Sequence, residues 1–299
     1  MIARLILAAA LAVAAALAPS RAAASPWGAA YFPNVPLVTQ DGRTVRFYDD
    51  LLKDRKVLVN FVFTSCSAVC PLDTAKLVQV HRLLGARAGR DIHLYSITLD
   101  PDNDRPQDLK AYAEKYGAKW TFLTGRREDV DAVRHALGDR KPKEEHANTV
   151  RAGDVARGQW IRIPLAADAH YIEAEITNTF DPGWSAGRTL KSIAEAPRPE
   201  VFGPGELLFN NRCAACHTFG QGDRLGPDLG GVAVRRDRAW LARFLAAPDR
   251  MRASGDPVAR ELASRYKVVM PNLGLTRREL GDVLAYLEAR GGEAVAKAR

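Results

Sequence analysis

The sequence predicts two domains of different class, an α/β domain followed by a small all-α domain. Between residues 56 and 163, short apolar runs alternate with helical patterns, the order expected of a sheet flanked by helices. The four cysteines form two local pairs, Cys66 with Cys70 and Cys213 with Cys216, and each pair falls in a different half of the chain. We therefore expect two chemically distinct sites.

The first residues have the layout of an export signal. Arg4 precedes an apolar run from Leu5 to Ala18, and small residues follow at 22–24. The run is shorter than the roughly 20 residues that span a bilayer. We expect residues 1–24 to be a cleaved signal peptide and the protein to be periplasmic, touching a membrane only peripherally if the signal stays uncleaved.

The charge of the chain excludes one class of partner. The full sequence carries 43 basic and 35 acidic residues, a net charge of +8. These charges are scattered, and no helix-turn-helix, zinc-finger or RNA-binding signature is present, so no nucleic-acid partner is expected. A mild positive excess suits an acidic partner surface.

Residues 56–63 are nearly all apolar and rich in β-branched and aromatic side chains, which predicts a buried strand. Helical spacing follows in residues 77–84, and Pro71 suits the first turn of that helix. Cys66 and Cys70 then lie between a central strand and a helix N-terminus. The helix dipole favours thiolate there, which predicts a reactive or metal-binding pair.

The remaining pattern completes an α/β domain of thioredoxin-like type over residues 25–182. Apolar runs at 92–99 and 120–123 alternate with helical patterns at 106–116 and 128–137, and a hairpin is expected from 149–152 and 159–163. Prolines and glycines then predict a linker over residues 183–203. The all-α domain occupies 204–293, and residues 294–299 are a tail.

Residues 33 to 179 resemble the Sco/SenC family, thioredoxin-fold proteins of copper handling and cytochrome oxidase assembly. The matching segments are F-V-F-T-S-C at 61–66 with C-P at 70–71, S-I-T-L-D-P at 96–101 and W-T-F-L-T-G at 120–125. The C-x-x-x-C spacing differs from the C-x-x-C of thioredoxins. The resemblance implies one copper ion bound by Cys66, Cys70 and His146.

The third ligand is assigned from the resemblance. His81 lies 11 residues beyond Cys70 on the same expected helix, roughly 16 Å away, which is too far to share a metal. The residues from His146 to the expected hairpin resemble the family's histidine loop. The sequence alone does not exclude His93, His135 and His170.

Other uses of the first cysteine pair stay open. Cys66 and Cys70 can form a structural disulfide in an oxidising compartment, or act as a metal-free redox-active dithiol. Two thiolates and an imidazole suit Cu(I), tolerate Cu(II) and can also hold zinc. We expect Asp100 and Asp104 to cap loops and to have no catalytic role.

The second cysteine pair belongs to C-A-A-C-H at residues 213–217, the attachment signature of c-type haem. Thioether bonds from Cys213 and Cys216 would meet the two vinyl groups on one edge of the porphyrin. The adjacent His217 would then ligate the iron. One covalent haem c is predicted.

Residues 205–291 resemble a class I cytochrome c domain. The family's first helix matches residues 205–209, and its last helix begins at a capping box, Thr276 with Glu279. The resemblance implies that these helices cross at Gly205, Phe209 and Tyr286. It also implies that the carbonyl of Pro227 accepts the free N–H of the proximal histidine.

The sixth iron ligand follows by elimination. The chain has three methionines, of which Met1 lies in the signal and Met251 follows a helix-like stretch. Met270 precedes a proline in a loop, 53 residues beyond His217, and matches the family's distal ligand. Met251 remains the rival, since methionine often only fills gaps. A Met/His pair leaves no open coordination position, so we expect an electron carrier.

These observations favour a copper-binding electron carrier and metallochaperone over a catalyst. The leading hypothesis is copper delivery or reduction during assembly of a respiratory copper oxidase or reductase, whose subunit or redox protein is the partner. The alternatives are a thiol–disulfide oxidoreductase using Cys66 and Cys70, and a plain electron shuttle whose first domain only docks.

Overall fold

The computed structural model describes residues 27–66, 69–181 and 201–297. The expected signal peptide at 1–24 lies outside these residues, as does most of the expected linker at 183–203. Within the described residues, no helix combines the length and the apolar composition needed to cross a bilayer.

A seven-stranded mixed sheet forms the centre of the N-terminal domain, with strand order β2-β1-β5-β4-β3-β6-β7. Strand β3 pairs parallel with β4 and antiparallel with β6. The strands are β1 (Pro36–Thr39), β2 (Thr44–Arg46), β3 (Lys56–Val62), β4 (Ile92–Thr98), β5 (Thr121–Thr124), β6 (Thr149–Asp154) and β7 (Gln159–Pro164). Strands β1 and β2 are not among the predicted elements, although Asp41-Gly42 between them is a hairpin turn signal.

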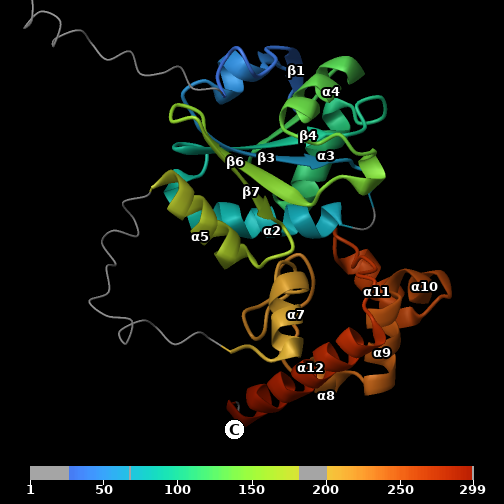
Figure 1. The fold of residues 1–299 in the computed structure, drawn as a ribbon. Coiled ribbons are helices and arrows are strands. Elements are labelled where there is room, and N and C mark those ends of the chain that lie inside the picture. The colour runs from blue at the N-terminus through green and yellow to red at the C-terminus, as the bar shows by residue number, and fades with distance from the viewer. Residues whose placement is uncertain (1–26, 67–68, 182–200, 298–299) are drawn as a thin grey trace, which may run out of the picture.

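Helices cover both faces of this sheet (Figure 1). Side chains of α2 (Cys70–Leu84), α3 (Pro106–Tyr116) and α5 (Ala169–Phe180) pack into one buried cluster. Side chains of η1 (Phe47–Leu52) and α4 (Arg127–Ala136) pack into the other. Because β3 is covered on both faces, its apolar run is continuous.

The described residues from 201 onward form helices and loops, without a strand among them. The helices are α7 (Pro204–Arg212), α8 (Val232–Arg235), α9 (Arg238–Ala246), α10 (Pro248–Ala253), α11 (Pro257–Arg265) and α12 (Arg277–Lys297). Helix α12 therefore continues through residues 294–297 of the stretch expected as a tail. The predicted α/β domain followed by an all-α domain is confirmed.

The crossing of α7 and α12 is the contact expected between the first and last helices. A Cβ atom built on Gly205 would lie 2.8 Å from the Cβ of Tyr286, and the Phe209 and Tyr286 ring centroids are 5.5 Å apart. The capping box also forms. The Thr276 N–H donates to the Glu279 carboxylate over 2.8 Å, and the Glu279 N–H donates to Thr276 Oγ1 over 3.2 Å.

Candidate functional site

The first cysteine pair lies at the junction between the end of β3 and the start of α2. Thr64, two residues before Cys66, donates its backbone N–H to Asp104 over 3.1 Å. The hydroxyls of Thr64 and Thr98 also donate to this buried carboxylate. Asp104 thus ties together the loops that follow β3 and β4, which is the loop-capping role expected from the sequence.

Cys70 begins α2 and is buried, whereas Cys66 is half-buried. A hydrogen bond with the Cys66 thiol, and then burial, raise the pKa of the Cys70 thiol. This differs from the sequence expectation that the helix N-terminus favours thiolate. Within the structure, the neighbouring thiol and the apolar surroundings outweigh the helix dipole. The Cys70 thiol therefore keeps its proton until metal binding or oxidation to a disulfide removes it.

His146 comes from the loop before β6 and points at Cys70. The distance from its Nε2 to Cys70 Sγ is 3.9 Å. Its Nδ1 is buried and has no hydrogen-bond partner among the described residues. Burial lowers the pKa of His146, so the imidazole is neutral and its nitrogens can ligate a metal.

The other histidines left open by the sequence lie elsewhere. His93 pairs with Val57 at the far end of β3, about 16 Å from the cysteine loop at 3.3 Å per residue. His135 and His170 are exposed on α4 and α5. His81 stacks on the ring of Trp120, with the centroids 5.9 Å apart. The structure thus brings His146 to the cysteine pair.

A buried ionic network holds the loop that carries His146. Asp139, 3% exposed, accepts from Arg134 over 3.2 Å and from Arg151 over 3.4 Å. Arg151 also donates to the carbonyl oxygens of Leu137 and Thr149. Such a buried network is costly to break on one side. Its members lie 5 to 17 residues apart, and no local pattern in the sequence indicates it.

Cys66, Cys70 and His146 are donors that fit a soft metal ion, although the three side chains are not yet close enough together to bind one. Among the described residues, no three His, Cys, Asp or Glu side chains lie close enough together to hold a metal. Cys66, Cys70 and His146 therefore have to close on the ion to form a three-donor site. Two sulfurs and one imidazole nitrogen are the donors that copper prefers.

The second cysteine pair follows α7. The N–H groups of Cys216 and His217 each donate to the carbonyl oxygen of Cys213 over 3.0 Å, and this turn sets the spacing of the two sulfurs. Burial raises the pKa of Cys213 to about 12 and that of Cys216 to about 11. Both sulfurs are therefore uncharged in apolar surroundings that suit thioethers.

The loop after His217 fixes the imidazole. His217 Nδ1 donates to the carbonyl oxygen of Pro227 over 2.8 Å, the acceptor expected from the sequence. A Cβ atom on Gly226 would lie 2.7 Å from the His217 ring, so glycine is required for this close approach. Asp228 accepts the N–H groups of three glycines in the same loop (Gly220, Gly222 and Gly230).

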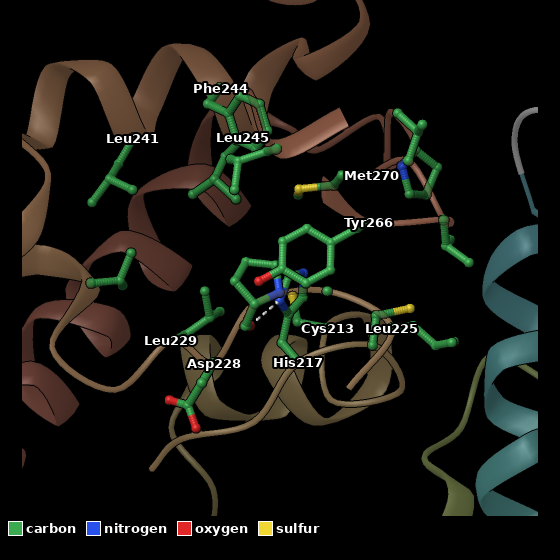
Figure 2. A pocket seen from close by; sticks show the side chains of 18 of the residues that line it. Cys213, His217, Leu225, Asp228, Leu229, Leu241, Phe244, Leu245, Tyr266 and Met270 are labelled. Carbon is green, nitrogen blue, oxygen red and sulfur yellow. Dashed lines mark hydrogen bonds between the residues drawn. The ribbon is translucent and has the colours of Figure 1, made fainter. Parts of the chain in front are cut away.

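The wall facing His217 is formed by the loop that carries Met270 (Figure 2). Both residues line a mainly apolar cavity of about 560 Å³, together with Cys213 and Cys216. Arg252 donates to the Met270 carbonyl oxygen over 3.3 Å and supports this loop. Met251 lies on α10 and is not among the residues that line the cavity.

The two walls of this cavity are joined by a polar bridge. Tyr266 donates its hydroxyl to Asp223 over 2.6 Å, and Asp223 in turn accepts the N–H of Asp228 over 2.9 Å. The cavity volume lies within the range of cofactor sites. With two cysteine sulfurs, one half-buried imidazole and one thioether facing it, the cavity fits a covalent haem.

Comparisons with known proteins agree with this division. Residues 29–154 match the SCO1/SenC family model, and residues 203–290 match the cytochrome c model. An SCO1 protein homolog of Bacillus subtilis is 37% identical over 89 residues, covering 29% of this chain and 45% of that protein. A putative copper-binding protein of Stutzerimonas stutzeri is 34% identical over 106 residues, covering 36% and 51%.

Among solved structures, copper-bound ScoI of Arabidopsis thaliana is similar to this chain. Its sequence is 19% identical, the similarity covers 51% of this chain and 99% of that one, and the TM-score is 0.44. The chain spans about half the length of the curated relatives it matches.

Proposed function

We propose, on the premise that this chain joins a SCO1/SenC domain to a cytochrome c domain, that it is exported to the periplasm and handles copper. Its first domain binds one copper ion through Cys66, Cys70 and His146 and delivers or reduces it. Its second domain carries one covalent haem c and moves single electrons. Its partner is a subunit of a respiratory copper oxidase or reductase under assembly.

One observation carries the copper assignment. His146 Nε2 lies 3.9 Å from Cys70 Sγ although 76 residues separate them. A neutral imidazole nitrogen held beside a thiol adds a third donor to the two sulfurs, and this set suits copper. Copper is the cargo of this site, and the hydrogen-bonded thiols release their protons as it binds.

In the second domain, His217 and Met270 would hold the iron while Cys213 and Cys216 attach the porphyrin. A haem with this ligand pair supplies one-electron transfer and offers no open position to a substrate. The Pro227 carbonyl keeps the His217 imidazole in one orientation and tautomer. Arg252 holds the Met270 backbone.

The direction of electron flow is limited by energetics. Dithiol couples on this fold lie at roughly −120 to −270 mV, and each 30 mV corresponds to about 1.4 kcal/mol for the two-electron couple. Met/His ligation raises the potential of a haem. We infer that the haem exchanges electrons with bound copper, or accepts them from the Cys66/Cys70 dithiol, and does not reduce the disulfide.

A second candidate, thiol–disulfide exchange at Cys66 and Cys70, is favoured by one buried acid. Burial raises the pKa of Asp73 to about 7, the charge of Lys76 opposes the shift, and Cys66 adds to it. A carboxyl group with this pKa beside a thiol can take up and return its proton. In this role the chain would reduce or oxidise a partner's cysteines.

Anaerobic copper titration of the reduced protein tests the proposal, with copper counted against haem. The expected result is one copper per haem in the wild type. Cys66→Ser and Cys70→Ser should each lose the copper while the haem spectrum stays intact. Undiminished copper binding in both variants would refute the copper assignment.

Stopped-flow mixing tests the direction of electron flow. The ferrous, disulfide, copper-free protein should show no haem oxidation. Rapid haem oxidation with matching appearance of thiols would show that the haem reduces the Cys66–Cys70 disulfide, and would refute the energetic argument.

A further inference from the structure

Helix α2 touches both sites at once. Its first residue, Cys70, faces His146, and the next two residues, Pro71 and Leu72, line the cavity that also contains Met270. In Figure 1 the C-terminal domain lies against α2, with α7 close to the helix. The thiol that would bind copper and the wall of the haem cavity are therefore joined by peptide bonds.

Apolar packing continues across this contact. Val268, which precedes the Met270 loop residue by two positions, is 7% exposed and belongs to the same buried cluster as Leu77 of α2. Leu225, from the loop after His217, packs against that cluster, and Figure 2 shows it beside the ribbon of α2. Both walls of the haem cavity thus contribute side chains to the core of the first domain.

Polar and electrostatic contacts support the same arrangement. Gln79 of α2 donates to the carbonyl oxygen of Ala215, which lies between the two attachment cysteines, over 3.3 Å. Burial raises the pKa of Tyr116 on α3 to about 12, and Cys216 of the second domain adds to the shift. The attachment edge of the haem site therefore faces α2 and α3.

We propose that the first turn of α2 docks the copper site onto the haem crevice, so that electrons pass between copper and haem inside one chain through Cys70, Pro71 and Leu72. The inference rests on the proposed function. With haem and copper both bound, one electron would pass from Fe(II) of the haem to Cu(II), giving Fe(III) and Cu(I), or would return by the reverse step. No bond is made or broken, and no proton is required.

The test uses the full chain with haem attached and Cu(II) bound. A flash-activated reductant places one electron on the haem, and haem reoxidation is followed at several protein concentrations. The wild type should reoxidise with a first-order rate that does not change with protein concentration. Leu72→Asp puts a charge against the apolar cavity wall, which should disfavour docking and slow the reaction about tenfold, or about 1.4 kcal/mol.

Matched variants distinguish a lost contact from a lost fold. Leu207→Asp makes the same change at an exposed leucine on α7, outside the cavity, and should leave the rate unchanged. Gln79→Ala removes only the hydrogen bond to Ala215 and should slow reoxidation in the same direction as Leu72→Asp.

A readout without copper completes the test. Amide hydrogen exchange in α2 and in residues 213–217 should quicken together in Leu72→Asp and stay unchanged in Leu207→Asp. A reoxidation rate proportional to protein concentration, or a Leu72→Asp rate equal to that of the wild type, would overturn the docking proposal and leave copper binding intact. Absence of copper binding in the wild-type titration would instead refute the proposed function.

Discussion

Replacing Gly205 by alanine should destabilise the cytochrome c domain at the crossing of α7 and α12. The new Cβ would overlap the carbonyl oxygen of Asp282 and lie 2.8 Å from the Cβ of Tyr286. Both are parts of a helix that cannot swing aside as a long side chain can. The two helices must separate, which loosens the scaffold that precedes the attachment cysteines.

The size of this effect follows from two opposing terms. Overpacking costs about 1–3 kcal/mol, and an alanine in place of a helical glycine returns about 0.5–1 kcal/mol. The new Cβ would overlap a backbone oxygen, which places the overpacking cost in the upper half of its range, about 2–3 kcal/mol. The net loss is then about 1–2.5 kcal/mol, which lowers Tm by roughly 4–20 °C at about 4–8 °C per kcal/mol in a domain of this size. Gly281 on α12 is the matched control, because a Cβ there meets no atom within 4 Å.

Thermal unfolding followed by the haem absorbance measures both variants. Gly205→Ala should melt below the wild type, and Gly281→Ala should melt slightly above it, since only the helix propensity term acts there. The attached haem in each variant shows that maturation has occurred. A Gly205→Ala protein that melts at or above the wild-type temperature would refute the close helix contact.

Three further predictions concern the two sites. Met270→Ala should lose the charge-transfer band of Met–iron ligation and lower the haem potential, whereas Met251→Leu should keep the band; the opposite pattern would reverse the axial assignment. His146→Ala should weaken Cu(II) far more than Cu(I), because two thiolates suffice for linear Cu(I), with exposed His135→Ala as the control; unchanged affinity for both ions would point to another ligand. Burial opposes ionisation of Asp228, but hydrogen bonds from backbone N–H groups and a hydroxyl outweigh this effect and hold the pKa of Asp228 well below 3.8. The stability that the ionised Asp228 contributes is therefore present at neutral pH and is lost as the pH falls below about 4. Asp228→Asn should therefore melt lower than the wild type at pH 7, with the difference shrinking in acid, and a difference that grows in acid would contradict this sign.

The sequence by itself determined the features whose chemistry is local. The C-A-A-C-H run at 213–217 specifies haem attachment because two sulfurs and one imidazole within five residues are enough for that chemistry. The strand at 56–63 and the helix begun by Pro71 were readable because a buried strand and a helix N-terminus each leave a short pattern. Helix α5 (Ala169–Phe180) is not among the predicted elements, although Ile172, Ile176 and Phe180 recur at helical spacing after the N-cap residue Asp168.

Tertiary structure decided the contacts between residues far apart in the chain. The sequence left His93, His135 and His170 open beside His146, and resemblance alone favoured the last. The sheet register places His93 at the far end of β3, and the Asp139 network holds the His146 loop over Cys70. These arrangements depend on packing over tens of residues, which no local periodicity records.

The contact between α2 and the haem crevice is the clearest case of this kind. Val268 and Leu225 look like ordinary apolar residues of a cytochrome loop, and Gln79 looks like a solvated position on a helix. Their partners lie in the other domain, so neither domain's own pattern indicates that they form an interface. The sequence determined that two cysteine pairs lie in two domains of one chain, and the fold decided that these domains touch, because burial of apolar surface between domains depends on their mutual shape.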